Sequence, residues 1–209
     1  MITIIDYKLG NLFSIKNFFL NLNYKVEITS NPKKILKSKI IILPGVGAFD
    51  EAMRNIKKLK LDKILKNITK DKDKLFIGIC LGFQLMFESS EENKKTKGLS
   101  IFQGKVINLN KRIKKLPIPH TGWSIVKFNQ SNKKKNIKKF INNKSYYFVH
   151  SFFILPKNKK EILSSTNYEN LSFCSSISKN NVYGFQFHPE KSGINGIKLI
   201  NQILKNHEV

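Results

Sequence analysis

A cysteine between two glycines, placed where an apolar run ends, is the feature that most constrains the fold of this chain. Residues 75–79 (LFIGI) predict a short buried strand, and residues 81–89, with apolar side chains at helical spacing, predict the helix that follows. Cys80 therefore stands on a strand-to-helix turn. Gly78 and Gly82 give the spacing Gly-x-Cys-x-Gly, which is that of a nucleophile elbow, a strained turn with little room beside the nucleophile.

The position of Cys80 also favours reactivity. The N–H groups at a helix N-terminus, together with the helix dipole, favour a thiolate over a thiol. The N–H of Leu81, the next residue, is free to form one half of an oxyanion hole. The alternative is a small buried hydrophobic residue between two close-packing glycines, a common role for a free cysteine. The turn alone does not decide between these interpretations.

A second motif near the end of the chain supplies partners for a cysteine nucleophile. Residues 181–187 alternate as a strand, and a residue before proline is biased to extended geometry, so His188 and Glu190 are predicted to project from the same side. A base beside an orienting carboxylate, combined with Cys80, is the arrangement for nucleophilic attack on an acyl carbon. The two motifs together predict a Cys-His-Glu triad.

A third segment is predicted to complete the site. Residues 40–43 (IIIL) predict a buried strand that runs into residues 44–49 (PGVGAF), where two glycines allow backbone amides to turn toward a ligand. Alone, this pattern indicates an ordinary strand-to-helix loop. Beside a nucleophile elbow, it is predicted to hold the second oxyanion donor.

Taken together, the motifs resemble those of the class I, triad-type glutamine amidotransferases. Within that group the chain is similar to the HisH family, the glutaminase subunits of imidazole glycerol phosphate synthase. The resemblance runs nearly end to end, through residues 5–7, 10–12, 43–49, 78–84, 87–92, 119–123, 148–151 and 186–192.

The resemblance implies a role for each matching residue. The triad would consist of the nucleophile Cys80, the general base His188 and the orienting carboxylate Glu190. The substrate glutamine would be held by Gly45, Gln84, Ser151 and Phe152. The oxyanion would be bound by Val46, Gly47 and Leu81. Contacts with a partner subunit and gating of ammonia would fall to Asn11, Trp123, Tyr147 and Lys191.

Two positions depart from the family pattern. The family usually has glycine at the position of Lys8 and commonly methionine at the position of Thr121. Lysine does not easily adopt a positive φ, so the loop after the first strand is expected to take a different path. Neither change touches the triad, whereas both bear on docking of a partner.

By the same resemblance, the chain would hydrolyse L-glutamine to glutamate and ammonia without a cofactor or a metal. Ammonia would pass through a tunnel to a cyclase subunit, a (β/α)₈ barrel, in a heterodimer that makes imidazole glycerol phosphate and aminoimidazole carboxamide ribotide for histidine biosynthesis. The sequence has no phosphate-binding loop or cofactor motif that could perform this second half of the reaction.

Three other functions remain open at this stage. The first is a paralogous glutaminase subunit that supplies ammonia for surface-sugar biosynthesis. The second is a non-catalytic binding subunit, which the intact Cys80, His188 and Glu190 argue against. The third is a cysteine hydrolase that acts on peptides or small amides without any partner.

A net charge of +24 raises nucleic-acid binding as a further alternative, because a basic surface is its electrostatic footprint. The lysines are spread along the chain, however, and Arg54 and Arg112 are the only arginines, whereas nucleic-acid readers prefer arginine for bidentate contacts. The densest lysine runs, in residues 133–135 and 157–160, lack interleaved aromatic residues. Specific nucleic-acid binding is therefore not expected, while weak, salt-sensitive adhesion to polyanions remains open.

Length and cysteine usage favour one cytoplasmic domain. The 209 residues, of which 41% are hydrophobic, fit a single glutamine amidotransferase domain over residues 1–209. No apolar stretch is long enough to span a membrane, and residues 1–6 predict a strand where a signal peptide would need a long apolar region. Cys80 and Cys174, the two cysteines, fit a reducing compartment and show no metal-site spacing.

The order of predicted elements gives the fold class. The predicted strands include residues 2–5, 25–29, 40–43, 75–79, 146–149 and 173–178, and the predicted helices include residues 11–22, 49–58 and 193–205. This order predicts an α/β fold with a mostly parallel central sheet flanked by helices, an antiparallel extension, and a site at the carboxyl ends of the strands. Residues 130–144, rich in Lys and Asn, predict a variable loop.

Overall fold

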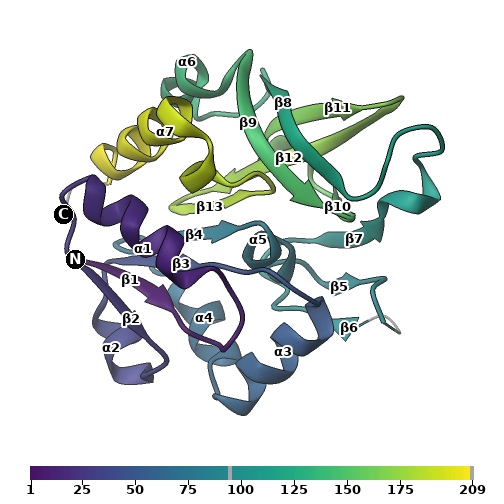
Figure 1. Ribbon diagram of the computed structural model, residues 1–209. Coiled ribbons are helices and arrows are strands. Elements are labelled where there is room, and N and C mark those ends of the chain that lie inside the picture. The colour runs from purple at the N-terminus through teal and green to yellow at the C-terminus, as the bar shows by residue number, and fades with distance from the viewer. Residues whose placement is uncertain (94–95, 208–209) are drawn as a thin grey trace.

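The computed structural model describes residues 1–93 and 96–207, and its framework is a 13-stranded sheet (Figure 1). The strands are β1 (Ile2–Ile5), β2 (Val26–Thr29), β3 (Ile40–Leu43), β4 (Leu75–Ile79), β5 (Ser89–Ser90), β6 (Thr96–Lys97), β7 (Gly104–Asn108), β8 (His120–Phe128), β9 (Lys144–His150), β10 (Phe152–Pro156), β11 (Ile162–Tyr168), β12 (Leu171–Lys179) and β13 (Val182–Phe185). The main path of the sheet is β2-β1-β3-β4-β13-β12-β10-β7-β5-β6, and β11, β8 and β9 continue from β12.

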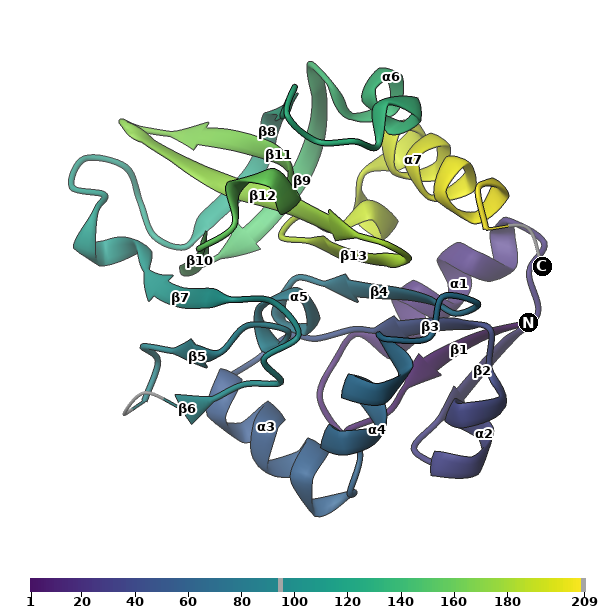
Figure 2. The same cartoon turned by 180° about the vertical axis from the view of Figure 1, so that it is seen from behind.

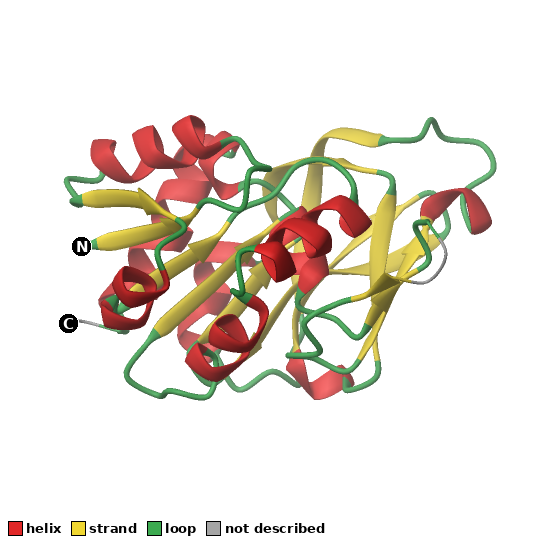
Figure 3. Cartoon of the chain, turned by 90° about the horizontal axis from the view of Figure 1, so that it is seen from below, coloured by secondary structure: helices red, strands yellow, loops and turns green. Residues whose placement is uncertain are grey.

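The predicted division into a parallel centre and an antiparallel extension is confirmed. The strands β2, β1, β3, β4 and β13 pair in parallel along the path. The other pairings among the described residues are antiparallel, apart from β5 with β7. Figure 3 shows helices gathered around one half of the sheet and mainly strands in the other half.

Helices cover both faces of the central strands (Figures 1 and 2). The helices are α1 (Leu12–Asn21), α2 (Pro32–Lys37), α3 (Phe49–Lys58), α4 (Asp62–Ile68), α5 (Leu81–Leu85), α6 (Lys138–Ile141) and α7 (Gly193–Lys205). Short 3-10 turns are η1 (Leu109–Lys111), η2 (Lys135–Ile137), η3 (Lys159–Glu161) and η4 (Pro189–Lys191). The helices α1 and α7 pack on one face of the sheet, and α2, α3 and α4 pack on the other.

The central strands are apolar throughout because both of their faces are buried. Side chains alternate between the faces of a strand, so Ile40 and Ile42 of β3 join the core under α1 and α7, while Ile41 and Leu43 join the core under α2, α3 and α4. A parallel strand covered on both sides therefore reads as a continuous apolar run, which is how these strands could be recognised in the sequence.

Two predictions about segments around the central sheet were wrong, one about the length of a helix and one about a loop. The helix predicted over residues 81–89 ends at Leu85, because residues 88–91 turn to bond with β7 and form β5 instead. The loop predicted over residues 130–144 contains η2 and α6, because Ile137 and Ile141 are fully buried in the core. Burial of these two side chains against distant strands was not visible in the local Lys/Asn-rich composition.

The expectation that Lys8 avoids a positive φ was also wrong. Lys8 has a φ of 69°, the region that glycine favours. Its N–H donates to Oδ1 of Asp6 at 2.8 Å, and its ammonium lies 3.1 Å from Oδ2 of the same carboxylate. These contacts offset part of the strain that a lysine meets in this backbone conformation.

No helix in residues 1–93 and 96–207 combines the length and the apolar character needed to cross a membrane.

Candidate active site

Three adjacent strands bring the three predicted motifs to one place. β3, β4 and β13 lie side by side and run parallel, with Leu43 opposite Gly78 and Ile79 opposite Phe185. The carboxyl ends of parallel strands meet at one edge of a sheet, so segments far apart in the sequence converge there. The N–H of Cys80, for example, donates to the carbonyl of Phe185 at 2.7 Å.

The turn at Cys80 has the strained geometry that its glycines predicted. Cys80 has φ 52° and ψ −110°, a conformation that costs a non-glycine residue on the order of 1–3 kcal/mol. A Cβ at position 82 would lie 1.9 Å from the carbonyl oxygen of Leu43, and one at position 78 would lie 2.5 Å from Sδ of Met86. Gly78 and Gly82 therefore permit a contact between backbone segments that no side chain would allow.

His188 and Glu190 form a buried pair beside this turn. Nδ1 of His188 lies 2.7 Å from Oε1 of Glu190, and the two side chains are only 3% and 1% exposed. Burial lowers the pKa of His188, but the neighbouring Cys80 and Glu190 side chains outweigh burial and raise this pKa to about 10. Because Glu190 occupies Nδ1, Nε2 is the ring nitrogen that can exchange a proton with the sulfur.

A cavity of about 320 Å³ opens beside Cys80. This volume is at the lower end of the range of small-molecule sites, roughly 300–1,000 Å³. The predicted site residues in its wall are Val46, Gly47, Leu81, Gln84, Ser151 and Phe152. Gly45 is not in the wall; a Cβ there would lie 2.4 Å from the hydroxyl of Tyr7, so this glycine allows the loop to pack closely.

Four other residues line the same cavity: Glu92, Pro119, Val149 and His150. Glu92 also contacts a segment that lies far away in the sequence. Its carboxylate accepts a hydrogen bond from the N–H of Phe49 at 2.9 Å, at the start of α3. No local sequence signal could reveal this contact, because the two residues belong to segments that only the fold brings together.

The loop between β3 and α3 is held at both ends. The hydroxyl of Tyr7 donates to the carbonyl of Pro44 at 2.6 Å, and Glu92 holds the other end of the loop. Burial, with a contribution from the charge of Cys80, raises the pKa of Tyr7, so its hydroxyl remains a donor. Val46 and Gly47 lie between these anchors, and Gly47 has a φ of 105°.

Leu81, whose N–H was predicted as one half of an oxyanion hole, lies in the wall of the same cavity. Leu81 is the first residue of α5, so its N–H has no partner within the helix. It lines the cavity together with Val46 and Gly47. The wall therefore combines a free helix N–H with a glycine-bearing loop beside the nucleophile.

Three of the four residues predicted to face a partner, Trp123, Tyr147 and Lys191, lie on β8, β9 and η4. The ring of Trp123 lies edge-to-face with that of Tyr147 at 6.1 Å, and the ammonium of Lys191 lies 5.8 Å from the centre of the Tyr147 ring. The carbonyl of Tyr147 accepts a hydrogen bond from the N–H of His188 at 2.9 Å, so this cluster is attached to the triad. Asn11 caps the N-terminus of α1.

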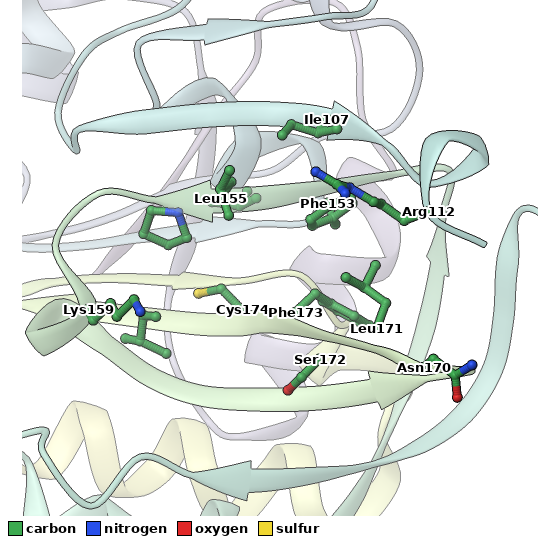
Figure 4. A pocket seen from close by; sticks show the side chains of 13 residues that line it. Ile107, Arg112, Phe153, Leu155, Lys159, Asn170, Leu171, Ser172, Phe173 and Cys174 are labelled. Atoms are coloured by element: carbon green, nitrogen blue, oxygen red, sulfur yellow. The ribbon is translucent and has the colours of Figure 1, made fainter.

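A larger cavity, of about 450 Å³, lies between β7, β10 and β12 and has different chemistry (Figure 4). It contains Cys174, whose pKa is raised by burial and whose sulfur donates to the carbonyl of Ser176. Its wall has no histidine or carboxylate to activate this thiol. Within residues 1–93 and 96–207, no group of three or more His, Cys, Asp or Glu side chains is suited to hold a metal ion.

Three buried histidines make the free energy of unfolding depend on pH, with an acid limb and an alkaline limb on either side of a maximum. The raised pKa of His188 contributes stability in full below the ordinary value of 6.5, and this contribution is lost as pH rises toward about 10. Burial lowers the pKa values of His120 to about 4 and of His150 to about 3, so their contribution is present above 6.5 and is lost as pH falls toward 3. The free energy of unfolding should therefore be largest near pH 6.5.

Urea unfolding at pH values from 4 to 9.5 measures these limbs. The alkaline limb should fall by on the order of 1 kcal/mol per pH unit at its steepest. His188→Gln should flatten it, because glutamine does not titrate. An unchanged alkaline limb in this variant would contradict the assignment of the limb to His188.

The fold and this arrangement of Cys80, His188 and Glu190 define a class of protein, the glutamine amidotransferases. Residues 3–206 match the glutamine amidotransferase class-I family. A crystal structure of a glutamine amidotransferase has the same fold, with a TM-score of 0.75 at 12% identity over 99% of each chain. The structure of PurLQS from Thermotoga maritima gives a TM-score of 0.71 at 16% identity, covering 98% of this chain and 97% of that one.

Comparison with curated proteins shows which family of glutamine amidotransferases the chain resembles. The chain is 46% identical to imidazole glycerol phosphate synthase subunit HisH 2 of Methanococcus maripaludis, over 98% of this chain and 99% of that protein. It is 43% identical to the HisH subunit of Pyrococcus furiosus over 95% of each, and 36% identical to that of Bacillus subtilis over 98% of this chain and 96% of that one. The chain belongs to the HisH family of class-I glutamine amidotransferases.

This family membership confirms the resemblance on which the sequence interpretation rested. It identifies the chain as a glutamine-hydrolysing enzyme subunit. The alternative of a surface-sugar paralogue is not favoured, because the relatives carry the name of the imidazole glycerol phosphate synthase subunit.

Proposed function

We propose that this chain is the glutaminase subunit of an imidazole glycerol phosphate synthase in histidine biosynthesis and that Cys80, His188 and Glu190 are its catalytic residues. The observation that carries the proposal is the buried His188–Glu190 pair beside the strained turn of Cys80, at the edge of a cavity of about 320 Å³. Glutamine occupies this cavity, held by Gln84 and the backbone of residues 151–152.

The reaction follows from the positions of these groups. The sulfur of Cys80, its proton passed to His188, attacks the side-chain amide carbon of glutamine. The oxyanion is bound by the N–H of Leu81 and by the loop with Val46 and Gly47. His188 then gives this proton to the amide nitrogen, the C–N bond breaks, ammonia leaves, and the thioester remains. A water molecule that gives its proton to His188 hydrolyses the thioester and releases glutamate.

The released ammonia requires a partner. In water ammonia is protonated and ceases to be a nucleophile, so it must pass directly to a second site. We propose that this site is in a cyclase subunit with a (β/α)₈ barrel fold, bound as a heterodimer through Trp123, Tyr147, Lys191 and Asn11. Through the hydrogen bond between Tyr147 and His188, binding of the partner at this interface would affect the position of the triad histidine. Residues 1–209 act in this complex as a single cytoplasmic domain, consistent with two buried free thiols.

Glutamine hydrolysis measured with and without the partner tests the function. The purified chain is assayed alone, then with a histidine-pathway cyclase subunit, and then with the ribotide substrate of that subunit. Strong stimulation by the loaded partner is expected. Rapid hydrolysis by the chain alone that a correctly folded cyclase leaves unchanged would contradict the proposal.

Trp123→Ala tests the docking surface. Trp123 is 56% exposed on β8, and a large aromatic side chain at an interface is a typical hot spot, worth about 2 kcal/mol or more. The dissociation constant of the partner, measured by titration calorimetry, should rise roughly thirtyfold. Leu36→Ala, which removes an exposed apolar side chain from α2, should leave it unchanged. Equal binding of the Trp123→Ala variant and the unmodified chain would remove Trp123 from the interface.

A further inference from the structure

An amide side chain with no assigned role touches the nucleophile. Gln186 directly follows β13 and is completely buried. Its Nε2 lies 3.8 Å from Sγ of Cys80, and its Oε1 lies 3.0 Å from Nε2 of Gln84. Burying an amide costs free energy unless the amide is hydrogen-bonded. The amide of Gln186 bonds to the nucleophile and to a residue of the substrate cavity.

The orientation of both amides follows from one backbone carbonyl. Nε2 of Gln84 lies 3.1 Å from the carbonyl oxygen of Phe152, and a carbonyl can only accept a hydrogen bond. The amide nitrogen of Gln84 must therefore face Phe152, and the atom of Gln186 that meets the same nitrogen must be its oxygen. This leaves the N–H₂ group of Gln186 facing the sulfur of Cys80 as a donor.

The same reasoning fixes what Gln84 can offer to a ligand. Both of its N–H donors are used, one by Phe152 and one by Gln186. Only its carbonyl oxygen retains capacity for a further bond, so Gln84 can act toward the cavity only as an acceptor. It would therefore recognise an N–H group of the bound molecule, such as an ammonium, and not a carboxylate.

A pair of histidines holds the other end of this network. Nδ1 of His150 donates to the carbonyl of Phe152 at 2.8 Å, so its Nε2 must be the acceptor for Nδ1–H of His120, at 3.0 Å. Nε2 of His120 in turn accepts from the hydroxyl of Ser124 at 2.8 Å. The position of the Phe152 carbonyl is thus fixed from β8, and with it the two amides that depend on it.

We propose that Gln186 is a further functional residue of this site, which donates a hydrogen bond to the sulfur of Cys80 and at the same time holds Gln84 as an acceptor for the substrate. The proposal rests on the proposed glutaminase function. A donor aimed at the sulfur stabilises the negative charge of the attacking thiolate. The hydrogen bond to Gln84 fixes the position of this substrate contact relative to the nucleophile.

Two substitutions separate these two roles. Gln186→Met keeps the approximate length and volume but removes both hydrogen bonds. Gln186→Glu keeps an acceptor for Gln84 and removes the donor to Cys80. Both are made in a Cys174→Ala background, so that Cys80 is the only thiol. The matched control is Gln202→Met, which removes an amide from the outer part of α7.

Two readouts are compared at pH 7. The first is the rate of Cys80 alkylation by iodoacetamide, which requires no bound glutamine. It should fall about tenfold in both Gln186 variants and stay unchanged in Gln202→Met. The second is steady-state glutamine hydrolysis in complex with the cyclase subunit. There kcat should fall at least tenfold in both Gln186 variants, whereas KM should rise at least fivefold in Gln186→Met and stay within twofold of the unmodified value in Gln186→Glu.

The difference between the two variants is what a purely space-filling residue would not produce. Alkylation and kcat within twofold of the unmodified protein in Gln186→Met would overturn the donor role. Equal KM values in the two variants would overturn the role toward Gln84. Circular dichroism checks the fold, and if Gln186→Met does not fold, alkylation of Gln186→Glu alone decides the donor role.

The outcome also separates this inference from the proposed function. If the unmodified complex hydrolysed no glutamine, the glutaminase proposal would fail while the alkylation rates would still report on Gln186 and Cys80. If hydrolysis were normal and insensitive to Gln186, the inference would fail and the proposed function would stand.

Discussion

Replacing Cys80 by alanine should abolish glutamine hydrolysis while leaving the fold intact. The sulfur is the atom that would form the thioester, and no neighbouring group can substitute for it, because Cys174 lies in a different cavity with its pKa raised by burial. Loss of a nucleophile in a comparable triad costs about 10⁶-fold in kcat, so activity should fall at least about 10⁴-fold. Alanine and cysteine meet the same strain at this φ, so stability should change little.

Glutamine turnover in the complex with the cyclase subunit, at saturating glutamine, measures this loss. Cys174→Ala is the control, because it removes the other thiol of the chain and should keep full activity. A Cys80→Ala protein that still supported glutamine-dependent turnover would disprove the assignment of the nucleophile. An ammonia-dependent cyclase reaction that survives in the variant complex would show that the loss is confined to the glutaminase site.

Gly82→Ala should destabilise the protein more than any substitution of an exposed residue. A Cβ at this position would lie 1.9 Å from the carbonyl oxygen of Leu43 and 2.8 Å from that of Pro44. The first belongs to the last residue of β3 and the second to the residue that follows it, and β3 is bonded to β1 on one side and β4 on the other. The strand cannot move aside without breaking the central sheet, so we expect a loss of about 3 kcal/mol or more.

The loss of stability is measured by urea unfolding, with Gly193→Ala as the matched control. Gly193 also has a positive φ, 54°, but a Cβ there meets nothing within 4 Å. Its replacement should cost only the backbone strain, on the order of 1 kcal/mol. If the two variants were equally stable, the contact between the turn and β3 would not be as close as the structure has it.

Elements whose signal is local were predictable from the sequence. The helices α3 and α7 begin and end where their apolar periodicity predicted, at Phe49–Lys58 and Gly193–Lys205. The strands β1, β3 and β4 also match their predicted residues, because a strand buried on both faces leaves a continuous apolar run. Periodicity and apolar runs depend only on neighbouring residues, so no knowledge of the fold was needed.

Elements that depend on distant partners were not predictable in the same way. The helix after Cys80 stops at Leu85 because residues 88–91 bond to β7, and α6 forms where Ile141 reaches the core. The contact of Glu92 with Phe49 likewise joins two segments that the sequence separates. In each case the energy comes from a hydrogen bond or a buried contact whose other half lies far along the chain.

The sequence by itself determined the chemical groups of the site: a cysteine at a glycine-flanked turn, and a histidine and a glutamate at the fixed spacing of residues 188 and 190. Only the tertiary structure decided how they meet, by placing β13 beside β4 in parallel register so that the segment after Phe185 reaches Cys80. It also decided the orientation of Gln186, because the direction of a hydrogen bond is set by the group that faces it, and that group is a backbone carbonyl on β10.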